Sequence, residues 1–362
     1  AAKQRGTHIY HLNIGQPDVE TPPEFFDAIS HADLEVLSYI HSAGIEPLRK
    51  QIVAYYGRLG HDLTQDDVMV TTGASEALHF VFSSLMDPGD EVIIPEPCFV
   101  SYAPEVMFAG GNPVLVPTHV EDDFQVTAAT IEAAITSKTK AILLGYPNNP
   151  TGAVMTREVM ADISTVAEQH DLLIISDEIY DRLVYGIDHT CVPSLPGMRD
   201  RTILLGGFSK DYAMTGWRIG YACANPDLLA AMRKVHQYTI MSAPTTAQAA
   251  AVVALEQGEE HVERMRQEYD RRRRLIVDGF NTLGLNCFEP RGEFYAFPSI
   301  VASGMSSDDF AMRLLDEEEV AVVPGDACGA SGAGFVRASY ATAYEKIEEA
   351  LIRVERFMHR HG

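Results

Sequence analysis

Between residues 66 and 224 the chain alternates short apolar, β-branched runs with amphipathic stretches, and this alternation constrains the fold more than any other feature. Six runs have the length and composition of buried strands: residues 68–70, 91–94, 114–116, 141–144, 172–175 and 202–205. Helical periodicity fills three of the intervals, at residues 75–86, 127–135 and 157–170. Strands that alternate with helices in this way predict an α/β fold with a mostly parallel central sheet.

The C-terminal third of the chain has a different pattern. Two long helices are expected at residues 246–255 and 259–280, followed by strands near 293–297 and 334–339 and by helices at 307–318 and 344–361. A chain of 362 residues exceeds what one hydrophobic core usually supports. We therefore expect a large α/β domain over residues 25–277 and a smaller α+β domain formed by residues 1–24 and 278–362.

The charge balance argues against a nucleic-acid partner. The chain has 28 basic and 51 acidic residues, a net charge of −23, whereas phosphate backbones require a basic surface. The basic run Arg271–Arg274 follows several glutamates in a helical stretch, so we interpret it as a solvated helix face. An anionic small ligand must then be bound by a few well-placed cations.

The cysteines and the apolar runs indicate the compartment. Five cysteines are scattered without any CxxC spacing, which fits neither a disulfide framework nor a metal site and favours the reducing cytoplasm. No apolar run reaches the length of a membrane span, and residues 1–6 lack the apolar core of a signal peptide. We expect a cytoplasmic protein with no membrane partner and no metal.

Three of the buried strands run into unusual polar segments, at residues 146–152, 176–180 and 206–210. The carboxyl ends of the strands line the ligand crevice of an open α/β sheet, so these segments are expected to converge. They bring Lys210 and an acid, Asp177, to strand ends, and residues 72–75 form a glycine turn before a helix. The turn is either a plain helix N-cap, with Glu76 close behind, or a phosphate cup. A lysine, an acid and a phosphate cup are what a pyridoxal phosphate enzyme requires.

The chain as a whole resembles the class I aminotransferases of fold type I, similar to bacterial and archaeal aspartate or aromatic aminotransferases. The resemblance extends from Leu12-Asn13-Ile14-Gly15-Gln16-Pro17-Asp18 to Phe335-Val336-Arg337-Ala338-Ser339-Tyr340. Its most specific motif is Ser209-Lys210 followed by Met214-Thr215-Gly216-Trp217-Arg218-Ile219-Gly220. The resemblance implies a homodimer with shared active sites and a large domain that binds pyridoxal 5′-phosphate.

The resemblance also assigns roles around the cofactor. Lys210 matches the lysine that forms the Schiff base and then moves the proton, and Asp177 matches the partner of the pyridine nitrogen. Because such a carboxylate lies beside a cation, we expect a lowered pKa for Asp177. The other implied cofactor contacts are Tyr180 and Asn149 on the 3′ oxygen, Gly73, Ala74, Ser75, Ser209 and Arg218 on the phosphate, Phe99 stacked on the ring, and Tyr39 reaching the partner subunit's phosphate.

The substrate contacts follow from the same resemblance. Arg337 matches the arginine that forks onto the substrate α-carboxylate, a geometry that lysine lacks. Gly15 matches a glycine whose backbone approaches that carboxylate, and Phe99 and Asn149 also border the substrate. The chain departs from many relatives at Gly207, where a phosphate-binding hydroxyl is missing, and at Ser75, where some aspartate-specific relatives have a lysine.

The substrate side chain is the least determined feature. His41 and Ser75 could donate hydrogen bonds to a second carboxylate, Phe99 and Ile14 could pack on an apolar side chain, and no second arginine stands out. We predict an aminotransferase of amino-acid metabolism that favours aspartate and 2-oxoglutarate. The alternatives are an aromatic or alanine aminotransferase, a lyase on the same scaffold, a non-enzymatic cofactor-binding sensor, or a nucleotide-binding α/β protein, for which no GxGxxG motif is present.

Overall fold

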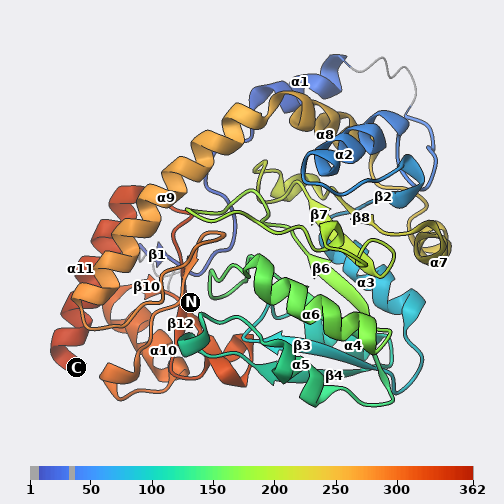
Figure 1. The fold of residues 1–362 in the computed structure, drawn as a ribbon. Helices are drawn as coiled ribbons and strands as arrows, with labels where there is room; N and C mark the ends of the chain where they lie inside the picture. The colour runs from blue at the N-terminus through green and yellow to red at the C-terminus, as the bar shows by residue number, and fades with distance from the viewer. Residues whose placement is uncertain (1–7, 32–36, 362) are drawn as a thin grey trace.

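A seven-stranded sheet forms the centre of the computed structural model, which describes residues 8–31 and 37–361 (Figure 1). In the order β2-β8-β7-β6-β5-β3-β4, every neighbouring pair is parallel except the two that involve β8. The α/β class with a mostly parallel sheet is therefore confirmed. The strands are β2 (Val68–Thr71), β3 (Glu91–Glu96), β4 (Asn112–Pro117), β5 (Thr139–Gly145), β6 (Leu173–Asp177), β7 (Thr202–Gly207) and β8 (Gly220–Cys223), of which the sequence pattern predicted all but β8.

Helices cover both faces of the sheet, which explains why its strands read as continuous apolar runs. In β3, Val92 and Ile94 pack in one hydrophobic cluster and Ile93 packs in another, because successive side chains point to opposite faces. The first cluster includes side chains of α3 (Ala74–Leu85), α4 (Tyr102–Phe108) and α7 (Pro226–Thr239). The second includes side chains of α5 (Ala128–Ala134) and α6 (Arg157–Gln169).

A third cluster lies at the β2 end of the sheet. Val68 and Val70 of β2 pack there with apolar residues of α2 (Glu46–Arg58) and α8 (Thr245–Gln257), and Phe25 of α1 (Pro23–His31) joins them. Figure 1 shows these three helices together beside β2.

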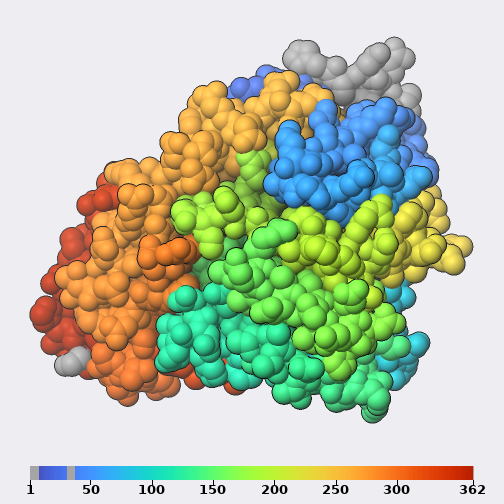
Figure 2. All heavy atoms as spheres, viewed as in Figure 1, coloured from blue at the N-terminus to red at the C-terminus, as the bar shows by residue number. Residues whose placement is uncertain are grey.

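The C-terminal elements have a hydrophobic core of their own. It contains residues from α9 (Glu259–Thr282), α10 (Ser307–Glu318) and α11 (Tyr344–His361) and from the short strands β9 (Tyr295–Ala296), β10 (Val320–Ala321) and β12 (Val336–Ser339). Tyr10 of β1 (Tyr10–His11) packs against it, and β11 (Val323–Pro324) completes the set of short strands. β1 pairs with β10, and β12 lies between β11 and β9. Figure 2 shows this orange and red part of the chain as one flank of the molecule. The division into two domains stays a prediction, and α9 crosses its expected boundary at residue 277 without a break.

The arginine run on α9 corrects one expectation. Arg271 and Arg274 are exposed, but Arg272 and Arg273 are only 7% exposed. Arg272 binds Asp18 at 2.7 Å, and Arg273 binds Glu289 at 2.9 Å. The interpretation of the whole run as a solvated face is therefore wrong for the two central arginines, whose buried charges are paired with acids from other segments.

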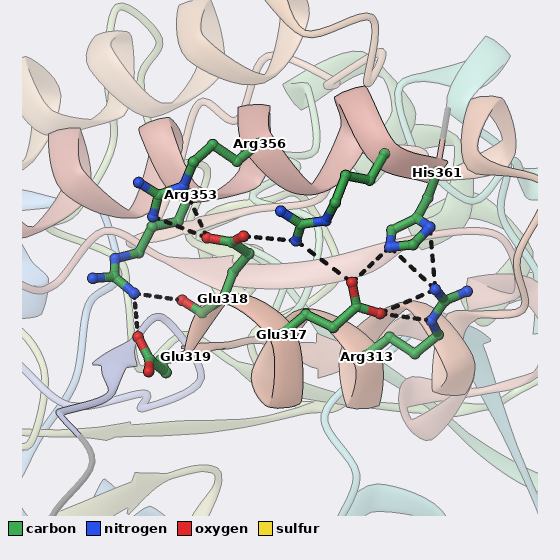
Figure 3. Close-up of polar contacts among 8 residues, drawn as sticks. Arg313, Glu317, Glu318, Glu319, Arg353, Arg356 and His361 are labelled. Carbon is green, nitrogen blue, oxygen red and sulfur yellow. Dashed lines mark hydrogen bonds and ion pairs between the residues drawn. The ribbon is translucent and has the colours of Figure 1, made fainter.

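An ion-pair network joins α10 to α11 (Figure 3). Glu318 accepts hydrogen bonds from Arg356 at 2.9 Å and from Arg360 at 2.6 Å, and its side chain is 7% exposed. Glu317 lies 2.6 Å from the ring of His361. The network fixes the last helix of the chain against the helix that precedes β10.

Candidate active site

The three polar strand ends converge, as their sequence placement predicts. In the sheet register Gly145 of β5 lies beside Asp177 of β6, and Asp177 lies beside Leu205 of β7. A cavity of about 520 Å³ opens at this edge. The predicted site residues that line it are Gly15, Ala74, Ser75, Phe99, Asn149, Asp177, Tyr180, Ser209, Lys210, Arg218 and Arg337.

Two predicted site residues do not line this cavity. Gly73 lies at its margin as the N-cap of α3. Tyr39 lies outside, and 83% of its surface is exposed in the single chain. Of the candidates for the substrate side chain, Ser75 and Phe99 line the cavity, whereas His41 and Ile14 do not.

Lys210 enters the cavity three residues after the end of β7. Its amine donates a hydrogen bond to the backbone oxygen of Gly15 at 2.6 Å and lies 5.7 Å from the centre of the Tyr180 ring. The pKa of Lys210 is lowered to about 8, chiefly by burial and also by the charges of Arg337 and Arg218, which together outweigh the opposite effect of Glu293 and Asp177. This amine therefore releases its proton far more readily than a surface lysine.

Asp177 is the last residue of β6. Its Oδ2 accepts a hydrogen bond from the Tyr102 hydroxyl at 2.8 Å, and its Oδ1 accepts one from the Ile179 N–H at 3.3 Å. Burial raises the pKa of Asp177 above its ordinary value, and these hydrogen bonds lower it only in part. The expected lowering of this pKa is thus wrong for the protein alone, because removal of water from the carboxylate outweighs the two hydrogen bonds and the charge of Lys210.

The turn before α3 has the shape of an anion cradle. Gly73 has φ +80°, and a Cβ built there would lie 2.7 Å from Nη2 of Arg218, so the turn requires glycine. The backbone N–H of Thr72 donates to the Glu76 carboxylate at 2.6 Å, so Glu76 closes the turn while residues 74 and 75 border the cavity. Arg218, Ser209 and Ser75 add a cation and two hydroxyls, and this donor set at a helix N-terminus fits a phosphate group.

Gly207 of β7, where many relatives carry a phosphate-binding hydroxyl, lies beside Gly220 of β8. A Cβ at Gly207 would lie 2.9 Å from the Ile179 side chain and 3.2 Å from the Gly220 Cα. The close approach of β8 therefore leaves little room for a serine at this position.

Neighbouring groups orient the guanidinium of Arg337, on β12, so that it can bind a second anion. Its Nη1 donates to Oδ1 of Asn149 at 2.9 Å, and its Nη2 donates to the backbone oxygen of Asn13 at 3.2 Å. The guanidinium lies 4.3 Å from the centre of the Tyr295 ring, and its buried Nε has no hydrogen-bond partner among the described residues. A Cβ on Gly15 would lie 1.9 Å from the Tyr295 hydroxyl, which explains the glycine there.

Several lining residues were missed from the sequence. Tyr102 contacts Asp177 and Tyr295 contacts Arg337. Tyr102 lies three residues after Phe99, and Tyr295 lies in the strand expected near residues 293–297. No local pattern distinguished them from core aromatic residues. The remaining missed residues that line the cavity are Gln16, Leu78, Val100, Pro147, Ile179, Thr215, Val323 and Cys328.

Within residues 8–31 and 37–361, no helix has the length and hydropathy of a membrane span. The same residues contain no group of three or more histidine, cysteine or acidic side chains that could hold a metal ion.

The sheet, the lysine and acid at its strand ends, and the anion cradle opposite them define a pyridoxal phosphate enzyme of fold type I. Comparison with known proteins narrows this class. The pattern of the family "Aminotransferase class I and II" matches residues 7–354. The chain belongs to this family and is an aminotransferase that depends on pyridoxal phosphate.

Individual relatives are similar over almost their whole length. The aspartate aminotransferase of Pyrococcus abyssi is 41% identical, with 97% of this chain and 92% of that protein covered. Aromatic-amino-acid aminotransferase 2 of Thermococcus litoralis is also 41% identical, with the same coverage. The crystal structure of the aromatic aminotransferase from Pyrococcus horikoshii superposes with a TM-score of 0.96 at 41% identity, covering 99% of both chains.

Proposed function

We propose that this aminotransferase moves the amino group of aspartate to 2-oxoglutarate, with Lys210 as the catalytic residue. The observation that carries the proposal is the grouping of Lys210, Asp177 and Arg337 around one cavity. The aspartate aminotransferases among the relatives support the choice of substrate.

The cavity fits pyridoxal phosphate in size and in donor set. When bound, the cofactor supplies an aldehyde that takes up amino groups and a ring that accepts the electrons left at the substrate Cα. Asp177 would hold the ring nitrogen, and Phe99 would stack on the ring. The 3′ oxygen would be bound by Tyr180 and Asn149, and the phosphate by Arg218, Ser209, Ser75 and the backbone N–H groups of residues 73–75.

The chain's own residues would then bind the substrate and move one proton. Arg337, fixed by Asn149 and Asn13, would bind the α-carboxylate through its remaining N–H groups. The Lys210 amine, with its pKa lowered to about 8, would take the proton from Cα and pass it to the cofactor's C4′. The Gly15 backbone would border the carboxylate without a side chain in the way.

An aromatic amino acid is the second candidate substrate. The cations that line the described cavity are Lys210, Arg218 and Arg337, all of which have roles in the scheme above. The walls also include Leu78, Val100 and Val323, on which an aromatic ring would pack. The names of the relatives from Thermococcus litoralis and Pyrococcus horikoshii agree with this alternative.

We further propose a cytoplasmic homodimer with shared active sites. The exposed Tyr39 side chain, outside the cavity of its own chain, is consistent with a role at the partner's phosphate. The neighbouring Leu37 is 62% exposed in the single chain, as expected for a surface that a second subunit covers. The cytoplasmic compartment rests on the five cysteines, all of which are unpaired.

Borohydride reduction of the holoenzyme tests the proposal. It should attach the phosphopyridoxyl group to Lys210, and Lys210→Ala should bind cofactor but lose transamination, whereas Lys234→Ala on α7 serves as the control. A label on another lysine would refute the assignment. A single-turnover panel of aspartate, glutamate, phenylalanine and alanine then decides the donor. Faster turnover of phenylalanine than of aspartate would overturn the favoured substrate and leave the chemistry intact.

A further inference from the structure

Tyr102, the first residue of α4, is placed to act on the cofactor through Asp177. Its hydroxyl donates a hydrogen bond to Oδ2 of Asp177 at 2.8 Å, and 5% of the residue is exposed. The Ile179 N–H also donates to this carboxylate, and the charges of Glu178 and Lys210 act on it. Tyr102 is thus the one side chain described as donating a hydrogen bond to Asp177.

The residues around Tyr102 also fix the position of its side chain. Gly145 pairs with Asp177 in the sheet, and a Cβ on Gly145 would lie 2.3 Å from the Tyr102 hydroxyl. The missing side chain on β5 therefore makes room for the hydroxyl that reaches β6. The tyrosine ring also makes a T-shaped contact with Phe99, with ring centres 5.5 Å apart and an interplanar angle of 82°.

We propose that Tyr102 is a positioning residue for the cofactor ring, because it fixes the Asp177 carboxylate and supports Phe99 at the same time. The inference rests on the proposed function, in which Asp177 holds the ring nitrogen and Phe99 stacks on the ring. A carboxylate that has lost a buried hydrogen bond is less stable as an anion. Asp177 then competes more strongly with the ring nitrogen for the shared proton.

A purely structural role for Tyr102 predicts a different result, and Tyr146 provides the matched control. Tyr146 is also buried, and its hydroxyl donates a hydrogen bond of 2.8 Å to the backbone oxygen of Phe124, away from the lining of the cavity. Tyr102→Phe and Tyr146→Phe each remove one buried hydroxyl and one hydrogen bond. Only the first removes a bond to Asp177.

The experiment measures the dissociation constant and the absorption spectrum of bound pyridoxal phosphate for the wild type and both variants. We expect Tyr102→Phe to weaken binding on the order of tenfold or more, the loss typical of a hydrogen bond to a charged group. Its bound-cofactor spectrum should titrate at a pH different from that of the wild type. Tyr146→Phe should match the wild type in both measurements.

A cofactor analogue separates an effect on the ring nitrogen from a general loss of cofactor binding. In 1-deaza-pyridoxal phosphate a C–H group replaces the ring nitrogen, so Asp177 has no ring proton to bind. The wild type and Tyr102→Phe should bind this analogue about equally. Should Tyr102→Phe not fold, Gly145→Ala, whose Cβ displaces the same hydroxyl, is expected to give the same pattern.

Two outcomes overturn the inference. One is wild-type affinity and spectrum in Tyr102→Phe, and the other is an equal loss for pyridoxal phosphate and its deaza analogue, which would indicate a general packing defect. Failure of the proposed function is recognised separately, by borohydride labelling of the wild type at a residue other than Lys210.

Discussion

Arg337→Lys tests how the enzyme recognises the part that all its amino-acid substrates share. Each terminal nitrogen of Arg337 already donates one hydrogen bond, Nη1 to the Asn149 side chain and Nη2 to the Asn13 carbonyl. Since a guanidinium has five N–H groups, enough remain for a fork onto a carboxylate. The ring of Tyr295 fixes the plane of this fork from 4.3 Å away.

A lysine at residue 337 keeps the charge but loses the fork. Its single nitrogen cannot bind Asn149, the Asn13 carbonyl and two carboxylate oxygens together, so at least one charge-assisted bond is lost, worth about 1.5 to 3 kcal/mol. Loss of the stacked guanidinium adds about 0.5 to 1 kcal/mol. Together these raise the barrier by about 2 to 4 kcal/mol, which corresponds to a fall in kcat/KM of about 30-fold to 1000-fold.

The assay is a single-turnover panel of aspartate, glutamate, phenylalanine and alanine, followed by cofactor absorbance. The loss should be similar for every donor, because every donor carries the same α-carboxylate. Arg353→Lys is the control, since that guanidinium also lies over a tyrosine ring, 4.6 Å from the centre of Tyr10, but belongs to α11 outside the cavity. A loss confined to aspartate and glutamate would refute the reasoning and assign Arg337 to the side-chain carboxylate.

Three further predictions follow from particular contacts. Gly73→Ala should weaken cofactor binding, measured by dialysis, because the new Cβ would lie 2.7 Å from Arg218 and the backbone would be strained at φ +80°. Unchanged affinity would contradict the assignment of this turn as the phosphate site. Tyr39→Phe mixed with Lys210→Ala should recover part of the activity through hybrid dimers, and no recovery despite proven hybrids would mean that each site is built from one chain. Glu318→Gln should destabilise the fold by about 1 to 3 kcal/mol in thermal unfolding. Burial raises the pKa of Glu318, but hydrogen bonds from Arg360 and Arg356 leave that pKa below its usual value. The stabilisation by Glu318 is therefore present at neutral pH and lost as the pH falls through the lowered pKa. Equal melting curves for Glu318→Gln and the wild type would contradict this prediction.

The sequence patterns predicted the sheet well where burial on both faces left continuous apolar runs, as in β3 and β5. β8 was missed because it has only four residues and begins with Gly220, the last residue of the Met214–Gly220 motif. Its antiparallel pairing with β2 and β7 depends on partners far away in sequence. Local periodicity carries no information about such pairing.

The candidate site shows the same division between local and tertiary information. Lys210 and Asp177 were identified because polar residues at strand ends are a local signal. Tyr102 was missed because its contact with Asp177 depends on the register of β5 and β6 and on the missing side chain of Gly145. The pKa of Asp177 was predicted in the wrong direction because a sequence does not show how far water is removed from a carboxylate.

Burial also explains how an acidic protein can select anionic ligands. The net charge of −23 belongs largely to the surface, where salt screens charges over about 8 Å at physiological ionic strength. The cavity contains the cations Lys210, Arg218 and Arg337, and Asp177 is the acid that lines it. Glu293, which acts electrostatically on Lys210 and Arg337, does not line the cavity, and burial raises its pKa well above the usual range. The local balance is therefore positive, and a phosphate and a carboxylate enter a favourable field that the overall composition conceals.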